Sequence, residues 1–490
     1  MFDGWLSLDR ALDRADAVPL AEQIYRQVRD AVRAGRAPGD RRLPSSRVLA
    51  RGLGVSRNTV NAAYELLRGE GLIVSRPGAA PVLAVPEAFS APLAGPAAAV
   101  RLSRQGAALA RDRHEADYVA RGGRLRPGHP DPALFPRDEW AWAMRRAVRT
   151  LSGDGLLYGH VQGLPDLRRV LAEALAARRG LPVMPEQVHV VPTVQSALAM
   201  LGRCLLDEGE TVWIEEPGYL GARAALGHGR LVPLPVDAEG ADASRLTGVP
   251  KLVYVTPSHQ YPTGVRMSLP RRLALLARAR RAGALVLEDD YDSEFLWEGR
   301  QVPALGALAE QGEVITLGTV AKSLLPGLRL AWFVAPPALS ARLAHAQANL
   351  GVMANVHAQA ALAAFIDSGR YHRHLDHIGG VYRARGAEMV RAIRARCGDA
   401  VVVAPPVGGL QVLVRFAPDR DDRAVAARLA RAGYSVPFLS GLYLSGRHSS
   451  GPNPGVPGRG ILVGFAAATE EQADMFARAL GDALACADGD

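Results

Sequence analysis

The first apolar pattern in the chain predicts one helix that is followed by a second, shorter helix. Apolar residues at positions 20, 24, 28 and 32 recur every four residues, which is the spacing of one helix face. Leu43-Pro44 then interrupts the pattern, and Ser45-Ser46 offers an N-cap for a short helix that runs through Leu49 and Leu53. Gly54 marks the turn that follows.

A third helix and a hairpin are expected next. Ser56 is placed to cap the helix, and the positions that form its inner face between 60 and 67 are apolar. Apolar runs at 72–74 and 82–84 predict a hairpin around Pro77-Gly78. Three helices and a hairpin in this order are typical of a winged helix-turn-helix.

From about residue 123 onward, apolar strands alternate with amphipathic helices. Nearly continuous apolar runs indicate strands buried on both faces, as in a mostly parallel sheet covered by helices. These runs lie at 188–191, 211–214, 252–256, 284–288 and 314–319. We therefore expect a multidomain chain with an N-terminal module (1–84), a linker rich in alanine, proline and arginine (85–122) and an α/β domain (123–490). The part after residue 378 is expected to be a smaller α+β lobe.

Composition and charge narrow the class of protein. The 490 residues are 48% hydrophobic and 22% charged, which is globular composition in a chain too long for one ordinary domain. The sequence shows no apolar membrane span and no secretion signal, and its three scattered cysteines fit a reducing compartment, so we expect a cytoplasmic protein without a membrane partner. The net charge of +9 suits a polyanion. Only two of the 58 basic residues are lysines, Lys251 and Lys322.

The N-terminal module carries a local excess of positive charge. Between positions 41 and 76 there are seven arginines and two acids, a balance that attracts phosphates. The third expected helix begins with Ser56-Arg57-Asn58-Thr59, whose side chains suit base edges in the major groove. A solvated basic face on a small helical domain is the competing interpretation.

In this region the sequence resembles the GntR family of bacterial regulators. The resemblance is carried by Pro19-Leu20, Leu43-Pro44-Ser45-Ser46-Arg47, Leu49-Ala50, residues 53–60 and Ala63-Tyr64. It implies that the module binds a double-stranded DNA operator. The residues that it places near DNA are Arg47, Ser56, Arg57, Asn58 and Thr59. The wing tip departs from the family's Gly-Ser-Gly-Thr and reads Pro77-Gly78-Ala79-Ala80.

The α/β domain carries side chains that suit pyridoxal phosphate. This cofactor requires a primary amine for its aldehyde, a carboxylate for its pyridinium nitrogen, a phosphate cradle and a ring-stacking partner. Lys322 and Asp289 come directly after or at the end of expected strands, where such groups gather in an open α/β sheet. Tyr291 follows two residues after Asp289 and can reach the ring hydroxyl. A strand-end cap is the plain alternative for Asp289, and Lys251 is the alternative amine.

Read as a whole, the chain resembles the MocR subfamily, which joins a GntR-type module to a class-I aminotransferase fold. The further matching motifs are Gly128-His129-Pro130-Asp131, Leu134-Phe135-Pro136, Tyr158-Gly159, Glu216-Pro217-Gly218-Tyr219, and residues 257–264, 288–295 and 321–329. The resemblance implies a type I pyridoxal phosphate fold with Lys322 as the Schiff-base lysine, Asp289 on the pyridinium nitrogen and Tyr291 on the ring oxygen. It also implies that Tyr219 stacks on the ring, that Thr319 and Arg329 hold the phosphate, and that Tyr158 reaches the phosphate bound by the partner subunit.

Three positions depart from the subfamily pattern. The phosphate-cradling turn, usually Ser-Gly-x-Gln, reads Pro192-Thr193-Val194-Gln195, which makes Thr193 and Val194 the candidate cradle residues. The arginine that binds a substrate carboxylate in amine-recognising relatives is replaced by Leu462, and Arg459 lies three residues away. The usual Gly-Leu-His is here Gly409-Leu410-Gln411.

We interpret the chain as a transcription regulator whose large domain binds pyridoxal phosphate and serves as effector sensor and dimerisation platform. The resemblance implies a head-to-tail homodimer, with a small amine or pyridoxal phosphate itself as effector. A working aminotransferase that carries a DNA-binding module is the competing class, and a DNA-binding dimer with a decayed cofactor site is a third. His372, His374 and His377 are expected to spread around a helix surface, so no metal site is expected.

Overall fold

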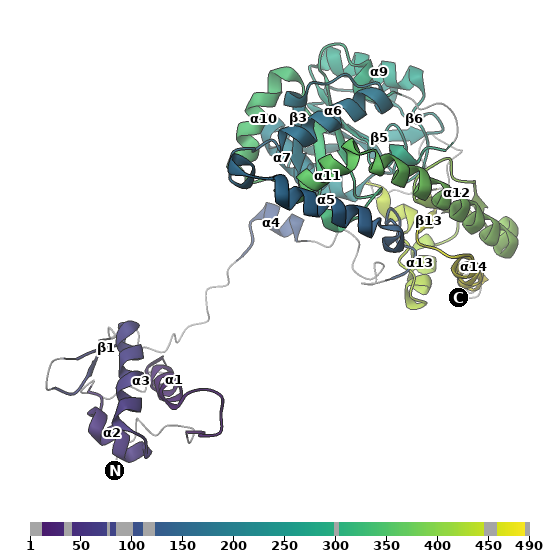
Figure 1. The fold of residues 1–490 in the computed structure, drawn as a ribbon. Coiled ribbons are helices and arrows are strands. Elements are labelled where there is room, and N and C mark those ends of the chain that lie inside the picture. Colours follow the sequence, from purple (N-terminus) through teal and green to yellow (C-terminus); the bar gives the residue numbers. More distant parts are fainter. Residues whose placement is uncertain are drawn as a thin grey trace. The chain divides into compact units, whose positions relative to one another are not determined.

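The computed structural model describes residues 12–33, 42–75, 79–84, 101–110, 123–297, 303–444 and 458–485. The chain divides into two compact units, Met1–Leu102 and Ser103–Asp490. Figure 1 colours them along the sequence, from purple at the N-terminus to yellow at the C-terminus. The expected wing tip at Pro77-Gly78 and most of the expected linker lie outside the described residues. In the linker the structure describes one short helix, α4 (Arg104–Leu109).

The described part of the N-terminal unit contains three helices and a two-stranded antiparallel hairpin, as the sequence predicts. The apolar stripe of the first helix packs on the third, and Ile24, Val28 and Val60 are fully buried in the core between them. Ser45 and Ser56 cap the second and third helices by accepting bonds from main-chain N–H groups three residues ahead. The elements are α1 (Leu20–Arg33), α2 (Ser46–Leu53), α3 (Arg57–Gly69), β1 (Ile73–Val74) and β2 (Val82–Leu83).

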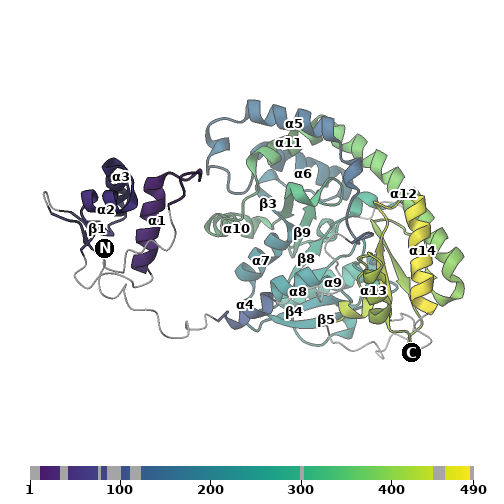
Figure 2. The same cartoon turned by 90° about the horizontal axis from the view of Figure 1, so that it is seen from below.

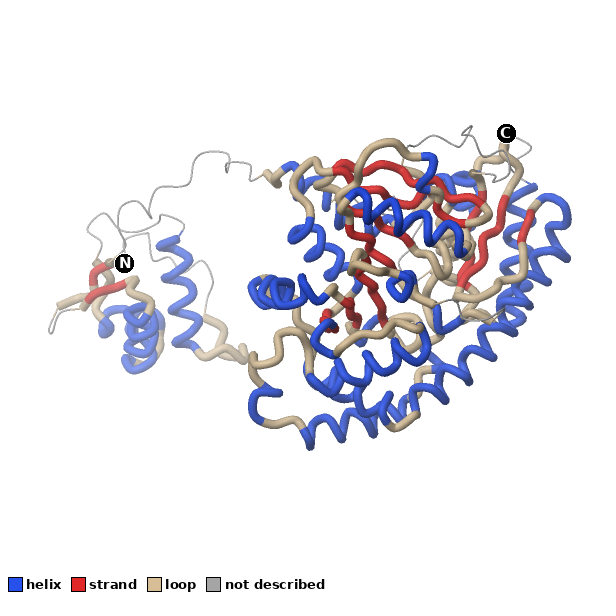
Figure 3. Tube along the Cα trace, turned by 90° about the horizontal axis from the view of Figure 1, so that it is seen from above, coloured by secondary structure: helices blue, strands red, loops and turns tan. Residues whose placement is uncertain are grey.

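The second unit is built on a mixed sheet that has eight strands in the described residues, with helices on both faces (Figures 1 and 3). Strands β4, β5, β7, β8 and β9 run parallel, which confirms the mostly parallel sheet. β10 is antiparallel to both of its neighbours, β9 and β3, which the sequence pattern does not predict. In sheet order the strands are β3 (Val188–Val191), β10 (Ala331–Val334), β9 (Val314–Thr319), β8 (Leu285–Asp289), β7 (Leu252–Val255), β4 (Thr211–Glu216), β5 (Arg230–Asp237) and β6 (Gly240–Ala241).

The helices of the large domain cover the sheet and shield its apolar strands from water. α5, α6 and α11 pack together on one side in both cartoon views (Figures 1 and 2). The helices of this domain are α5 (Arg137–Thr150), α6 (Pro165–Arg179), α7 (Val194–Leu205), α8 (Leu220–Leu226), α9 (Leu269–Ala282), α10 (Pro337–Asn349) and α11 (Val356–Asp367). Within the described ranges, no helix combines the length and the apolar character needed to cross a membrane.

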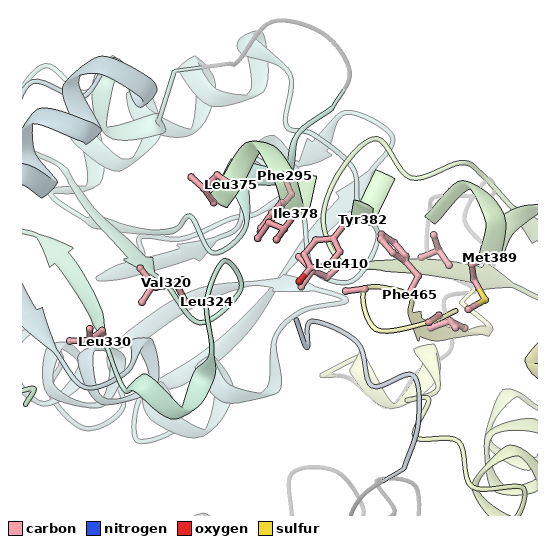
Figure 4. Close-up of a cluster of buried hydrophobic side chains, with 14 of the residues drawn as sticks. Phe295, Val320, Leu324, Leu330, Leu375, Ile378, Tyr382, Met389, Leu410 and Phe465 are labelled. Atoms are coloured by element: carbon pink, nitrogen blue, oxygen red, sulfur yellow. The ribbon is translucent and has the colours of Figure 1, made fainter. Parts of the chain in front are cut away.

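A long helix, α12 (Arg370–Cys397), leads from the large domain into the small C-terminal lobe. The lobe is the expected α+β unit, with β11 (Val402–Val403), β12 (Gln411–Arg415), α13 (Asp422–Arg431), β13 (Gly460–Gly464) and α14 (Glu470–Ala485). α12 and α14 lie side by side in Figure 2. Apolar side chains of α12 continue from the large domain into the lobe, where Tyr382 and Met389 join Leu410 and Phe465 in one buried cluster (Figure 4).

The histidines of α12 are only partly as expected. His374 is 8% exposed, and its Nε2 lies 2.8 Å from the main-chain oxygen of Ser323, so the expectation of a surface position is wrong for this residue. The helix turns His374 inward because it lies three and four residues from the core positions Tyr371 and Ile378. In the described part of the chain, no group of three or more His, Cys, Asp or Glu side chains is arranged to hold a metal.

Candidate cofactor site and candidate nucleic-acid interface

A cavity of about 360 Å³ lies at the carboxyl ends of the parallel strands, where the large domain meets the small lobe. This is the usual place for a ligand in an open α/β sheet, and the volume suits a small cofactor. It brings together most of the residues that the sequence predicts to bind a cofactor. Those that line it are Thr193, Val194, Tyr219, Asp289, Tyr291, Thr319, Lys322 and Arg329.

Lys322 reaches the cavity from the turn that follows β9. Its Nζ donates a 2.7 Å hydrogen bond to the main-chain oxygen of Gly128. Burial lowers the pKa of the Lys322 ammonium, against the opposing pull of the carboxylates of Asp292 and Asp289. A lowered pKa increases the fraction of neutral amine, which is the nucleophilic form. Lys251, the other lysine, is half-exposed at the start of β7 and lies 3.9 Å from Glu210, outside the cavity.

Asp289 ends β8 with its carboxyl group turned into the cavity. The side chain is 5% exposed, and Oδ2 accepts a 2.7 Å hydrogen bond from the Tyr254 hydroxyl. Oδ1 is buried and accepts no hydrogen bond from any residue that the structure describes. Burial raises the pKa of Asp289 to about 7, although the bond from Tyr254 opposes this. A buried carboxyl oxygen without a donor is what a protonated ring nitrogen would complete.

Tyr291 belongs to a buried polar group beside this carboxyl. Its hydroxyl lies 3.3 Å from Nδ1 of His259, whose same nitrogen is 2.8 Å from Asp292. Burial disfavours a charged imidazole, but the Asp292 carboxylate outweighs it and raises the pKa of His259. The imidazole and the phenol rings also stack, with centroids 6.1 Å apart. His259 therefore holds the Tyr291 side chain in its position at the cavity wall.

The opposite wall has the character of an anion cradle. Its main part is the N-terminus of α7, where the first N–H groups have no acceptor within the helix. The Thr193 hydroxyl caps this helix, accepting a 2.9 Å bond from the Ser196 amide, so the helix start is ordered by threonine in place of the usual serine and glycine. Arg329 contributes an exposed guanidinium from a left-handed backbone conformation, φ 52°. Thr319 lines the cavity while its hydroxyl donates to the Leu330 oxygen.

Three residues singled out in the sequence lie elsewhere. Tyr158 follows the 3₁₀ turn at Gly153–Leu156, is 85% exposed and lies outside this chain's own cavity. Leu462 is fully buried in β13. Arg459 forms an ion pair with the buried Asp422 at 3.1 Å. Gln411, by contrast, does line the cavity.

The sequence does not predict several residues of the site. Tyr254, His259 and Asp292 support the predicted residues through contacts described above, and Arg126 and Ser435 line the cavity. His259 lies within the motif 257–264, which was the one available signal for it. Nothing in the local pattern marks Tyr254 among the apolar residues of its strand.

The N-terminal unit presents its predicted DNA-contacting residues at the start of α3 and on α2. Arg47, Arg57 and Asn58 are exposed, and Thr59 is half-buried. Arg57 Nε donates a 3.2 Å hydrogen bond to the Ser46 hydroxyl, which joins the two helices. Ser56 accepts from the Thr59 amide at 3.1 Å and serves as the helix cap. A helix start that carries an arginine and an asparagine and faces solvent has the character of a recognition helix.

Comparison with known proteins agrees with both halves. Residues 20–82 match the family described as bacterial regulatory proteins, gntR family, and residues 131–480 match aminotransferase class I and II. The chain is 38% identical to a probable rhizopine catabolism regulatory protein, MocR, of Rhizobium meliloti, over 93% of this chain and 92% of that protein. It therefore belongs to the MocR subfamily of GntR-type transcription regulators, which carry a helix-turn-helix module of a DNA-binding class and an aminotransferase-like domain.

Two further similarities extend this placement. The pyridoxine biosynthesis transcriptional regulator PdxR of Corynebacterium glutamicum is 30% identical over 97% of this chain and 98% of its own length. The alpha-aminoadipate aminotransferase LysN of Thermus thermophilus, solved with N-(5'-phosphopyridoxyl)-L-leucine, superimposes with a TM-score of 0.69 and 27% identity, over 79% of this chain and 97% of LysN. The type I aminotransferase fold expected from the sequence is thus confirmed, and homologues with this fold depend on pyridoxal phosphate.

Proposed function

We propose that this regulator binds pyridoxal phosphate in the cavity of its large domain and uses it to sense a small amine or the cofactor itself. The observation that carries the proposal is the pairing, in one cavity, of the Lys322 amine with the buried and uncompleted Oδ1 of Asp289. When bound, the cofactor supplies an aldehyde carbon that primary amines attack and a ring that withdraws electrons from it.

Each residue of the cavity has a definite part in this proposal. Lys322 holds the cofactor covalently through its amine, and Asp289 keeps the ring nitrogen protonated. Tyr291, positioned by His259, binds the ring oxygen, and Tyr219 covers the ring face. The cradle binds the phosphate through Thr319, Arg329 and the start of α7 at Thr193 and Val194.

The N-terminal module supplies operator binding. Arg47 and Arg57 provide charge-assisted contacts to phosphates or guanine, and Asn58 and Thr59 reach base edges. The Ser56 side chain accepts the capping hydrogen bond from the Thr59 amide, so its part is to fix the first turn of α3 against the DNA. We propose the boundaries 1–84 for this module, 85–122 for the linker and 123–490 for the sensing domain.

The proposed assembly is a head-to-tail homodimer in the cytoplasm. Tyr158 supports it, because an aromatic side chain that is 85% exposed and remote from its own cavity is suited to complete the phosphate cradle of a partner. Two modules in one dimer would read two half-sites. The name of the Corynebacterium relative, a regulator of pyridoxine biosynthesis, supports pyridoxal phosphate as one effector to test.

Gel-shift titration tests the proposal. The full-length protein, with and without cofactor, is compared with the isolated 1–84 segment at one salt concentration, because phosphate contacts make affinity salt-dependent. We expect the full-length protein to bind more tightly through two linked modules, and its affinity to change with cofactor or amine.

Equal affinity of the two proteins, with no response to the cofactor, contradicts sensing. Repeated conversion of an added amine by the purified protein would instead support the competing function, an aminotransferase that carries a DNA-binding module. The Lys322→Ala variant serves as the control in both assays, because it retains the DNA-binding module and lacks the reactive amine.

A further inference from the structure

The cavity has two chemically different ends. The large-domain end holds the helix start of α7, Thr319 and Arg329, and the small-lobe end holds Arg126, Gln411 and Ser435. Among the described lining residues, Arg126, Lys322 and Arg329 are cationic and Asp289 is the one carboxyl. This excess of positive charge raises the local concentration of anions. The phosphate of the proposed cofactor accounts for the end that carries Arg329 and leaves Arg126 without an anionic partner.

The small-lobe end presents three polar side chains that are unsatisfied within the described residues. Gln411 is 6% exposed and Ser435 is 1% exposed, yet Gln411 Oε1 and Ser435 Oγ make no hydrogen bond there. The side chain of Arg126 likewise forms no hydrogen bond or ion pair with any described residue. The pKa of His129 is lowered to about 4, mainly by burial and then by the positive charges of Arg126 and Lys322. Arg126 and Lys322 therefore both act electrostatically on this part of the cavity.

Arg126 is held in place by its own backbone segment. Residues 124–126 run along the small lobe, where the Gly464 amide donates to Leu125 O at 2.8 Å and the Ser435 amide donates to Arg124 O at 2.9 Å. Gly464 permits this close approach, because a Cβ atom there would lie 2.1 Å from the Arg126 oxygen. The segment therefore extends the lobe at Gly464, the strand partner of Gln411, and its backbone lies next to that of Ser435.

Two other arginines near this end of the cavity, Arg459 and Arg124, are engaged elsewhere. Arg459 is bound to the buried Asp422, and position 462 on β13 is a fully buried leucine. Arg124 lies over the Tyr434 ring at 4.5 Å and donates to the Ala432 oxygen. Arg126 is thus the cation at the small-lobe end of the cavity among the residues that the structure describes.

We propose that Arg126, Gln411 and Ser435 form a carboxylate subsite, and that the amine sensed at Lys322 is one that carries a carboxylate. A guanidinium, an amide and a hydroxyl together satisfy both carboxylate oxygens with charge-assisted and neutral hydrogen bonds. The protein then recognises two groups of the same ligand, the amine at Lys322 and the carboxylate at Arg126. This inference rests on the proposed function, because the amine end requires the cofactor.

The test compares amines that differ only in the carboxylate. Full-length, cofactor-loaded protein is titrated with L-alanine against ethylamine and with 4-aminobutanoate against propylamine, and the cofactor's absorbance gives each apparent Kd. We expect the wild type to prefer the carboxylate member of at least one pair by about tenfold or more. Arg126→Ala should bring that ratio near one by weakening the carboxylate member alone, and Arg126→Lys should recover part of it.

Arg124→Ala is the matched control, because it removes the same charge two residues away, outside the cavity, and should leave the ratio unchanged. A second arm uses butanoate and cofactor-free protein in a calorimetric titration, where no covalent chemistry occurs. Wild type and Arg124→Ala should bind butanoate at least about tenfold more tightly than Arg126→Ala does.

The outcomes separate the two proposals. An unchanged ratio in Arg126→Ala, or a wild type without carboxylate preference in either pair, overturns the subsite. A wild type that takes up no pyridoxal phosphate overturns the proposed function instead, and the butanoate arm still decides whether Arg126 binds carboxylates.

Discussion

The Lys322 Nζ and the main-chain oxygen of Gly128 are joined by a 2.7 Å hydrogen bond that connects the end of β9 to the segment packed on the small lobe. Gly128 has φ 67°, and a Cβ atom at this position would lie 3.0 Å from the lysine nitrogen. The left-handed backbone conformation therefore favours glycine here, and a Cβ atom would crowd the end of the Lys322 side chain. The contact holds the amine at the cavity that Asp289 and the residues of the proposed carboxylate subsite also line.

Replacement of Lys322 by alanine should abolish covalent cofactor binding. We expect the variant to lose the absorbance at about 420 nm that is general for pyridoxal bound to an amine. We also expect borohydride reduction to trap no covalent adduct in this variant. Lys251→Ala provides the matched control, because it removes the only other lysine, which lies outside the cavity and is half-exposed. If the reducible adduct persists in Lys322→Ala and disappears in Lys251→Ala, the cofactor is attached to Lys251 and the assignment to Lys322 is wrong.

Asp289 should make the stability of the cofactor-free protein depend on pH. Burial raises its pKa to about 7, so the native state retains a proton that the unfolded chain has already released above pH 4. Stability should therefore fall as pH rises from about 4 to 7 and then level off. Asp289→Asn cannot ionise, and at pH 8 it should be more stable than wild type by on the order of 2–4 kcal/mol.

Urea unfolding of both cofactor-free proteins at pH 5 and pH 8 checks this expectation. The advantage of Asp289→Asn should be clear at pH 8 and small at pH 5. The same variant should bind the cofactor more weakly, since the amide lacks the charge that would hold a protonated ring nitrogen. Identical pH profiles of the two proteins would mean that the carboxyl is not buried as described.

Arg57, at the start of α3, should contribute to operator affinity, whereas an arginine at the end of the same helix should not. A bidentate contact to a base is worth about 1–3 kcal/mol, so Arg57→Ala should weaken binding by about tenfold to a hundredfold, with cofactor absorbance unchanged. Arg68→Ala removes an arginine from the opposite end of the helix, where it is paired with Glu65. Gel shifts on the promoter fragment that the protein protects should separate the two variants, and equal affinities would remove Arg57 from the interface.

Tyr158 should affect cofactor retention only within an assembly. If its hydroxyl completes a partner's cradle, Tyr158→Phe should increase the cofactor's Kd by about tenfold, the effect of one lost hydrogen bond to a charged group. The oligomeric state, measured by light scattering, should stay the same. Leu157→Ala alters the adjacent exposed residue and is the control. Unchanged cofactor affinity in Tyr158→Phe would exclude the hydroxyl from the cradle.

The helix caps, the apolar strands and the strand-end residues could be predicted, because each depends on a short stretch of sequence. The Ser45 and Ser56 caps and the apolar strands are local patterns, and the positions of Asp289 and Lys322 follow from the rule that polar groups gather at strand ends. The antiparallel insertion of β10 depends on chain topology, for which a short apolar run carries no signal.

The supporting residues of the site escape prediction because their contacts join distant parts of the chain. Lys322 meets Gly128 across 194 positions, and His259 meets Asp292 across 33. Arg126 shows no sign of its role in the sequence, where it is one of many arginines. Only the folded structure, in which the small lobe and the strand ends surround one cavity, shows that Arg126 lies at this cavity without a partner among the described residues.

The contact of α12 with Ser323, the residue next to Lys322, has a mechanical consequence. Tyr371 and His374, in the first turns of the helix, each hold Ser323 at 2.8 Å, through its hydroxyl and its main-chain oxygen. A helix of 28 residues is roughly 40 Å long, so a tilt of about 5° at this end moves the other end by roughly 3–4 Å. α12 therefore acts as a long rigid arm that is held at Ser323, one residue from Lys322. A displacement of this end of the helix that is too small to alter the cavity's shape would produce a larger displacement at the other end, in the small lobe.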